Sequence, residues 1–181
     1  MRNYGTLCIL LSVFCVFTLF VGMREASAEA DYTALRAANA GKMAQRQPFL
    51  LTVKPVVIFT FGGLSKQEPL DDILAALAER GMRGTFFVTE REIQRNADNI
   101  ERIVAAGQDL GIGLRPEAGA DFAAYCAQIE RIQTALQQRW GVTTNVVRQM
   151  SGADEDAINE AVSAMGCIFV GQGGDVVQAT Q

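Results

Sequence analysis

A regular alternation of short apolar runs and longer amphipathic stretches is the feature that most constrains how this chain can fold. It begins after Pro55, where residues 56–61 form a continuous β-branched and aromatic run, typical of a strand buried on both faces. Residues 69–80 then carry a single apolar stripe at helical spacing, which ends at Gly81. Further strands are predicted at 85–88, 109–113, 145–148 and 167–170, and further helices at 97–106, 120–140 and 154–165.

Strands that alternate with helices at this spacing form a parallel sheet through right-handed crossovers. The sequence therefore predicts an α/β fold. In such folds the functional side chains lie in the loops that follow the strands. Here these loops are residues 62–64, 88–90, 113–117 and 148–152.

The N-terminal residues have the pattern of an export leader. Arg2 precedes an apolar run from Leu7 to Val21, and Ala26-Ser27-Ala28 matches the cleavage pattern of signal peptidase. The apolar run is shorter than the ~20 residues that span a bilayer, which favours a cleaved leader over a membrane anchor. We predict a secreted, periplasmic or cell-envelope protein with a signal peptide at 1–28, a linker or short helix at 29–52 and one domain at 53–181.

The composition excludes several classes of function. The chain contains no histidine, so it cannot itself supply an imidazole as a base, a proton shuttle or a metal ligand. The net charge is −4 and there is no basic run, whereas a nucleic-acid binder needs a clustered positive surface, so no nucleic-acid partner is expected. Cys126 and Cys167 follow the predicted leader. They could form a disulfide in an oxidising compartment or remain as two buried thiols.

Three stretches of the chain match a known family in order and spacing. They are the buried strand that ends in Thr60-Phe61, the run Gly-Met-Arg-Gly-Thr-Phe-Phe-Val at 81–88 and the run Ala-Gly-Gln-Asp-Leu-Gly at 106–111. They resemble the polysaccharide deacetylase family, the NodB homology domain of carbohydrate esterase family 4. The resemblance covers residues 53–170 and implies a partial (β/α) barrel of about five parallel strands with flanking helices. It also implies a divalent metal, usually zinc, and removal of acetyl groups from N-acetylated sugars.

The positions at which this family carries its catalytic and metal-binding residues are altered here. The resemblance places the catalytic base at Gly62 and the metal ligands at Gly63, Gly113 and Glu117, and Glu117 alone among them has a donor side chain. Zinc hydrolysis needs about three protein ligands and a base with a tuned pKa. We therefore predict that the metal-dependent mechanism is lost, with no catalytic residue, no metal site and no cofactor.

Two arginines could still give the loops a binding role. The stretch Arg148-Gln149-Met150-Ser151-Gly152 takes the place of the family motif Arg-Pro-Pro-Tyr-Gly, whose arginine orients the base. Arg115 and Arg148 carry planar guanidinium groups, which suit carboxylates and sugar hydroxyls. The predicted residual groove consists of Arg148, Arg115, Glu117 and Glu90.

The remaining acids have less specific interpretations. Glu90, Glu92 and Glu117 could form an acidic cluster, although a solvated loop is the favoured interpretation. Asp71 and Asp72 are expected in the first turn of a helix, where the helix dipole favours carboxylates, rather than as a catalytic pair.

The favoured hypothesis is a secreted, non-catalytic polysaccharide-deacetylase-like protein that binds a glycan, such as a cell-envelope polysaccharide, or a protein. Two alternatives stay open: an active carbohydrate deacetylase with rearranged acids, and a degenerate truncated product. Five strands cannot close a barrel that needs roughly seven or eight. We therefore expect the edge of the fifth strand to be covered by the tail, by a partner chain or by a second copy.

Overall fold

The computed structural model describes residues 32–45, 58–64, 70–152 and 156–171. The chain divides into two units, Met1–Ala40 and Gly41–Gln181. The described part of the first unit contains a short helix at residues 32–38. The predicted leader lies outside the described residues. Within the part of the chain that is described, no helix is both long enough and apolar enough to cross a membrane.

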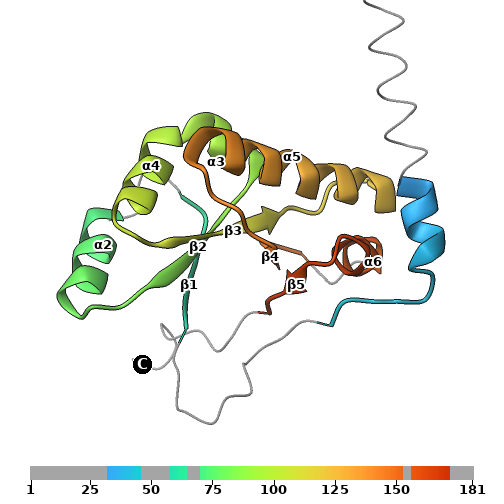
Figure 1. Cartoon of the computed structure of the whole chain (residues 1–181), viewed down its shortest axis with the longest axis horizontal. Helices are drawn as coiled ribbons and strands as arrows, with labels where there is room; N and C mark the ends of the chain where they lie inside the picture. The colour runs from blue at the N-terminus through green and yellow to red at the C-terminus, as the bar shows by residue number, and fades with distance from the viewer. Residues whose placement is uncertain (1–31, 46–57, 65–69, 153–155, 172–181) are drawn as a thin grey trace, which may run out of the picture. The chain divides into compact units, whose positions relative to one another are not determined.

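The second unit is built around one parallel sheet (Figure 1). Its five strands lie in the order of the chain, and each pairs in parallel with the next. A sheet whose strands keep chain order winds in one direction, as in a (β/α) barrel, whereas a doubly wound sheet reverses its order. The strands are β1 (Phe59–Gly62), β2 (Gly84–Val88), β3 (Asp109–Leu114), β4 (Val146–Gln149) and β5 (Ile168–Phe169), and the helices are α2 (Leu70–Glu79), α3 (Glu90–Arg95), α4 (Ala97–Ala105), α5 (Phe122–Trp140) and α6 (Asp156–Ala164).

These elements confirm the α/β fold with five parallel strands and flanking helices. The predicted strand at 109–113 ends one residue before β3 does, and the predicted helix at 69–80 extends one residue beyond each bound of α2. The start of the predicted strand at 56–61 lies outside the described residues, and its described part forms β1. Local periodicity therefore located every strand of the described sheet.

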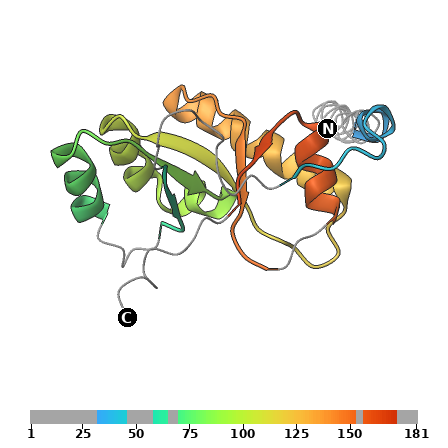
Figure 2. The ribbon, with the colours of Figure 1, turned by 90° about the horizontal axis from the view of Figure 1, so that it is seen from below.

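The two faces of the sheet carry different side chains. Because paired residues of parallel strands share a face, Phe86, Leu110 and Val147 belong to a fully buried apolar face. In Figure 1 the helices α4 and α5 lie above the sheet, and Figure 2 shows the same elements from below. The opposite face, where a barrel interior would be, carries Gly62, Phe87, Gly111, Gly113 and Arg148, so three glycines lie there beside two large side chains.

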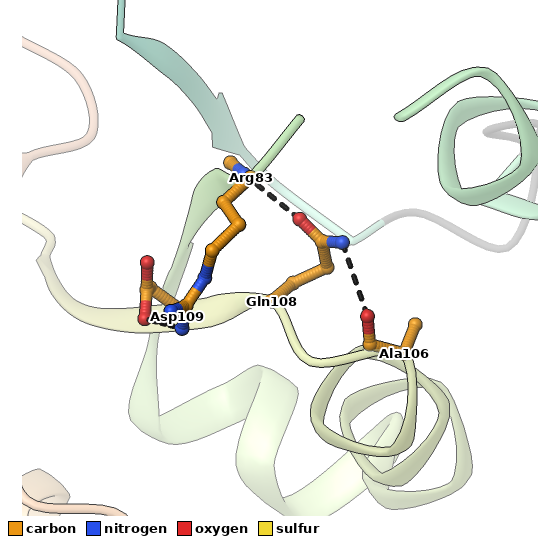
Figure 3. Close-up of polar contacts among 5 residues, drawn as sticks. Arg83, Ala106, Gln108 and Asp109 are labelled. Atoms are coloured by element: carbon orange, nitrogen blue, oxygen red, sulfur yellow. Dashed lines mark hydrogen bonds and ion pairs between the residues drawn. The ribbon is translucent and has the colours of Figure 1, made fainter. Parts of the chain in front are cut away.

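Polar contacts join the amino ends of β2 and β3 (Figure 3). The side-chain oxygen of Gln108 accepts from the backbone N–H of Gly84 at 2.8 Å, and its amide nitrogen donates to the carbonyl of Ala106 at 3.2 Å. Arg83 and Asp109 form an exposed ion pair with an N–O distance of 2.6 Å. These contacts set the start of the β2–β3 pairing at the end of the sheet opposite the loops that follow the strands.

The segment after β2 corrects one prediction. Glu90 and Glu92 were expected in a solvated loop, but they lie in the short helix α3, and Glu92 is only 7% exposed. Thr89 is the N-cap of α3, and its hydroxyl oxygen accepts from the Glu92 N–H, while the Glu92 carboxylate accepts from the Thr89 N–H. This reciprocal pair is a capping box, which the pattern Thr-x-x-Glu at 89–92 would have indicated.

The outer strands of the described sheet are β1 and β5. Ile58, next to β1, is 49% exposed, and Ile168 of β5 is 51% exposed. Exposed apolar side chains at a sheet edge favour pairing with another segment. What covers the edge of β5 stays a prediction.

Candidate functional site

An open pocket of about 570 Å³ lies at the carboxyl ends of the strands. Its volume falls within the ~300–1,000 Å³ that is usual for small-molecule sites. The pocket thus occupies the place at which the sequence predicted functional side chains. Its lining consists of residues 60–64 of β1 and its exit loop, Leu70 and Ile73 of α2, Phe86 of β2, and Arg115, Arg148, Met150 and Ser151 from β4 and the loops after β3 and β4.

The loop after β1 is held by side chains of α3 and of the residue that follows it. Gly63 has a φ of +79°, in the left-handed region that glycine adopts most readily. The next residue, Leu64, donates its N–H to the Glu92 carboxylate at 2.6 Å and accepts from the Asn96 side-chain amide at its carbonyl. The second carboxylate oxygen of Glu92 binds the N–H and hydroxyl of Thr89, both at 2.7 Å. Glu92 thus joins the exits of β1 and β2 and shapes one wall of the pocket.

Met150 fills the space between Gly62 and Gly113. A β-carbon placed on Gly62 would lie 2.7 Å from the terminal methyl carbon of Met150. A β-carbon placed on Gly113 would lie 3.1 Å from the Met150 sulfur and 3.1 Å from the methyl carbon of Thr89. Carbon atoms in van der Waals contact are about 3.5–4.0 Å apart. The methionine side chain therefore stands where side chains at 62 and 113 would project.

Arg148 points its guanidinium along the same face. One terminal nitrogen donates to the Thr60 hydroxyl at 3.2 Å, and the group lies 5.8 Å from the centre of the Phe87 ring. A β-carbon on Gly62 would be 4.0 Å from that nitrogen. Arg115 lines the pocket from the loop after β3 and is exposed. Two cationic side chains therefore reach the pocket.

The other two residues of the predicted groove, Glu90 and Glu117, form hydrogen bonds with side chains of α5. Glu90 receives two hydrogen bonds from Arg131 of α5, at 2.9 and 3.2 Å. The Glu117 carboxylate accepts from Gln128 of α5 at 3.3 Å. Neither glutamate is among the residues that line the pocket, so the structure brings together Arg115 and Arg148 but not Glu90 and Glu117. Asp71 and Asp72 lie in the first turn of α2, as predicted, and Asp71 pairs with Arg102 of α4.

The residues at the family's metal-binding positions do not fit a zinc ion. Gly63 and Gly113 have no donor side chain, and Glu117 binds Gln128 outside the pocket lining. Zinc takes about three protein ligands, and the thioether of Met150, which lies beside Gly113, is a soft and weak one. Within the described ranges no three His, Cys, Asp or Glu side chains are grouped so that they could hold a metal ion.

Cys126 and Cys167 are free thiols in the structure. Cys126 is buried on α5, and burial raises the pKa of its thiol to about 12. Burial also raises the pKa of the Cys167 thiol to about 11. A raised thiol pKa disfavours the reactive thiolate, so neither cysteine has the properties of a nucleophile.

The comparisons with known proteins identify the family. Residues 51–170 match the family model described as polysaccharide deacetylase. The chain belongs to this polysaccharide deacetylase family. The resemblance of the sequence motifs is thereby confirmed. A comparison with curated proteins finds no match.

Solved structures of carbohydrate esterase family 4 share the fold of this deacetylase-family chain. A pseudoenzyme from Bacillus anthracis has a TM-score of 0.55 at 17% identity, over 62% of this chain and 42% of the other. A mutant of this pseudoenzyme with restored enzymatic activity has a TM-score of 0.55 at 18% identity, over 62% of this chain and 43% of the other. The peptidoglycan deacetylase of Bdellovibrio bacteriovorus has a TM-score of 0.55 at 16% identity, over 80% of this chain and 49% of the other. PdaC, a peptidoglycan deacetylase of Bacillus subtilis, has a TM-score of 0.53 at 23% identity, over 63% of this chain and 57% of the other.

These likenesses establish the fold of this family member. At such low identity they do not carry over an activity. The chain spans between 42% and 57% of the lengths of these structures. Its strand order and its helices are those of the first part of a (β/α) barrel, as the resemblance implied.

Proposed function

We propose that this chain is a non-catalytic member of the polysaccharide deacetylase family that binds a cell-envelope glycan in the pocket at the strand ends. The observation that carries the proposal is the position of Met150. Its side chain takes the space next to Gly62 and Gly113, from which a catalytic base and a metal ligand would act. None of the described residues that line the pocket carries a carboxylate, so none of them offers a replacement base.

The lining residues suit the binding of a saccharide without a chemical reaction on it. Thr60 and Ser151 supply hydroxyls, and Arg115 and Arg148 supply guanidinium donors, which together match sugar hydroxyls and carbonyls. Leu64, Leu70 and Ile73 supply apolar surface to the pocket, and Phe61, which stacks on the buried Phe86 with ring centres 4.6 Å apart, is also a lining residue. Apolar walls with a few convergent polar groups are the usual composition of a binding site.

We place the protein outside the cytoplasm, secreted or in the cell envelope. The support is the leader pattern at residues 1–28 and the similarity to proteins named peptidoglycan deacetylases. An envelope glycan would meet the protein in that compartment.

The test uses purified protein freed of any histidine tag, because a tag would bind zinc itself. Thermal melts are recorded with and without zinc, and chitopentaose is incubated with the protein to measure acetate release. We expect a cooperative melt whose midpoint zinc does not raise, since a ligand stabilises only a native state that binds it. We also expect no acetate release, together with measurable binding of chitopentaose by calorimetry.

Each outcome decides one part of the proposal. Zinc-dependent acetate release would overturn the non-catalytic assignment and support the alternative hypothesis of an active deacetylase. A folded protein that binds neither chitopentaose nor peptidoglycan fragments would overturn the glycan-binding assignment. The matched control is Arg83→Gln, at the opposite end of the sheet, which should leave both results unchanged.

A further inference from the structure

We infer that Glu92 and Asn96 are positioning residues for the pocket, because together they hold Leu64 and with it the wall that the loop after β1 forms. We call these two side chains the Leu64 clamp. The inference rests on the proposed glycan-binding function and names the residues that regulate the affinity of the same pocket. It follows from the backbone freedom of the loop, from the two hydrogen bonds of the clamp, and from the further bonds of Glu92.

The loop after β1 gains little order from its own sequence. It begins with Gly62 and Gly63, and a glycine loses more backbone freedom on folding than any other residue. Contacts from elsewhere in the fold must therefore select one conformation of this loop. Residues 62–64 all line the pocket, so the contacts that hold Leu64 also hold this wall of the pocket.

The helix α3 and the residue at its C-cap supply these contacts. The Glu92 carboxylate accepts from the N–H of Leu64 at 2.6 Å, and the side-chain amide of Asn96 donates to the carbonyl of Leu64. Residues four apart at a helix lie on the same side of it, so both side chains can reach one loop residue. Both backbone polar groups of Leu64 are thus paired with side chains that lie 28 and 32 residues further along the chain.

The side chain of Asn96 contacts the loop instead of capping a helix. Asn96 is the N-cap of α4, a position at which an asparagine oxygen usually accepts from a backbone N–H of the first turn. Its side chain makes no such hydrogen bond to the described residues of α4. The amide donates to the Leu64 carbonyl instead, so this residue contributes to the pocket wall rather than to the start of α4.

The carboxylate of Glu92 also holds the exit of the next strand. Its second oxygen accepts from the N–H and from the hydroxyl of Thr89, both at 2.7 Å. The methyl carbon of Thr89 lies 3.1 Å from the position that a β-carbon on Gly113 would take. Three donors therefore share the two oxygens of one buried carboxylate, and an amide in its place would offer a single acceptor oxygen. Loss of the carboxylate would release the exits of β1 and β2 together.

The clamp sets the affinity of the pocket through the fraction of molecules whose wall is in place. When only part of a population can bind, the apparent Kd rises by the inverse of that fraction. Loss of a buried hydrogen bond to a charged group shifts such an equilibrium by a factor of about ten or more. A released clamp should therefore weaken glycan binding about tenfold while the sheet stays folded.

The experiment combines ligand binding with hydrogen exchange on tag-free protein. Calorimetry measures the Kd of chitopentaose well below the melting midpoint, and NMR measures the exchange of the Leu64 and Ile112 amides without ligand. Glu92→Ala and Asn96→Ala should each raise the Kd about tenfold and speed exchange at Leu64 by a similar factor. Ile112 lies in the centre of the sheet and should keep its protection. A merely structural role would lower stability and leave the Kd of the folded protein unchanged.

Further variants separate positioning from general destabilisation. Glu92→Gln should restore part of the affinity that Glu92→Ala loses, because an amide keeps one acceptor oxygen. Glu90→Gln is the matched control: Glu90 lies on the same helix but binds Arg131 and does not line the pocket, so neither the Kd nor exchange at Leu64 should change. Asn96→Ala leaves the capping box of Thr89 in place, so it keeps the test valid even if Glu92→Ala does not fold.

The outcomes separate the two proposals. An unchanged Kd for folded Asn96→Ala and Glu92→Ala would overturn this inference and leave glycan binding in place. Weaker binding without faster exchange at Leu64 would also overturn it, because the two side chains would then act by a route other than the loop. Failure of the folded wild type to bind chitopentaose or peptidoglycan fragments would overturn the inference together with the proposed function.

Discussion

The terminal methyl carbon of Met150 lies 2.7 Å from the position that a β-carbon of residue 62 would take, closer than two carbon atoms approach in contact. The observed position of the Met150 side chain therefore requires a glycine at residue 62, although the two residues are far apart in the chain. The sulfur of the same side chain approaches Gly113 in the same way. Rebuilding a deacetylase centre here would need Met150 to move as well as the return of the lost side chains, because its side chain stands next to positions 62 and 113.

This dependence predicts how zinc binding could be restored. The variant Gly62→Asp, Gly63→Asp, Gly113→His, Glu117→His should bind zinc weakly, because Met150 stands between two of the altered positions. Adding Met150→Ala should tighten zinc binding roughly tenfold, the usual scale for ligands that become correctly placed. Calorimetric titration with zinc on tag-free protein measures both affinities.

Met150→Ala alone is the control and should bind no zinc. Equal affinities of the two restored variants would show that the methionine does not obstruct the site. Folding of each variant is checked by its thermal melt, because the left-handed backbone at Gly63 makes Gly63→Asp strained.

Gly111 should tolerate a side chain less well than Gly62. A β-carbon on Gly111 would lie 2.6 Å from the ring of Phe87, which is 1% exposed and enclosed by the core. Overpacking of a rigid neighbour costs about 1–3 kcal/mol, so Gly111→Ala should lower the free energy of unfolding by that amount. Gly62→Ala meets only the movable end of Met150 and should cost less. Urea denaturation of both variants checks the order, and a larger loss for Gly62→Ala would contradict it.

Glu92 should contribute more to stability than Glu90, its neighbour on α3. Glu92→Ala leaves the buried N–H groups of Leu64 and Thr89 without their acceptor and removes the capping box. We expect a loss of about 2–4 kcal/mol in the free energy of unfolding. Glu90→Ala breaks a partly exposed ion pair with Arg131 and should cost about 0–1 kcal/mol. Similar losses from chemical denaturation of the two variants would refute the role of Glu92.

The buried thiol of Cys126 should make the protein less stable in alkali. Its pKa is 9.0 in the unfolded chain and about 12 in the folded protein, so below pH 9 the thiol is protonated in both states. Above pH 9 the unfolded chain loses the proton and the folded protein keeps it, so stability falls as the pH rises towards 12. At pH 10 this loss is about 1 kcal/mol.

The measurement compares the wild type with Cys126→Ala by urea denaturation at several pH values. The difference in stability between the two proteins should be constant up to pH 8.5 and should narrow above pH 9. A constant difference up to pH 10.5 would mean that the thiol titrates normally in the folded protein.

The strands and helices could be predicted from the sequence because they depend on neighbours a few residues apart. The apolar stripe of 69–80 and the stop at Gly81 located α2, and the Thr-Phe-Phe-Val run located β2. The parallel sheet followed from the alternation itself. The short helix α3 cannot be predicted from periodicity, because its six residues span fewer than two turns, and its local signal is the Thr-x-x-Glu pattern of the capping box.

The sequence by itself also determined which side chains are absent. Glycine at 62, 63 and 113 offers neither a base nor a metal ligand in any conformation, and no histidine elsewhere can replace them. Only the tertiary structure decided what occupies the vacated place and which charged groups share the pocket. Met150 meets Gly62, Glu92 holds Leu64, and Glu117 turns to Gln128, because packing joins residues distant in the chain, and no local pattern records such contacts.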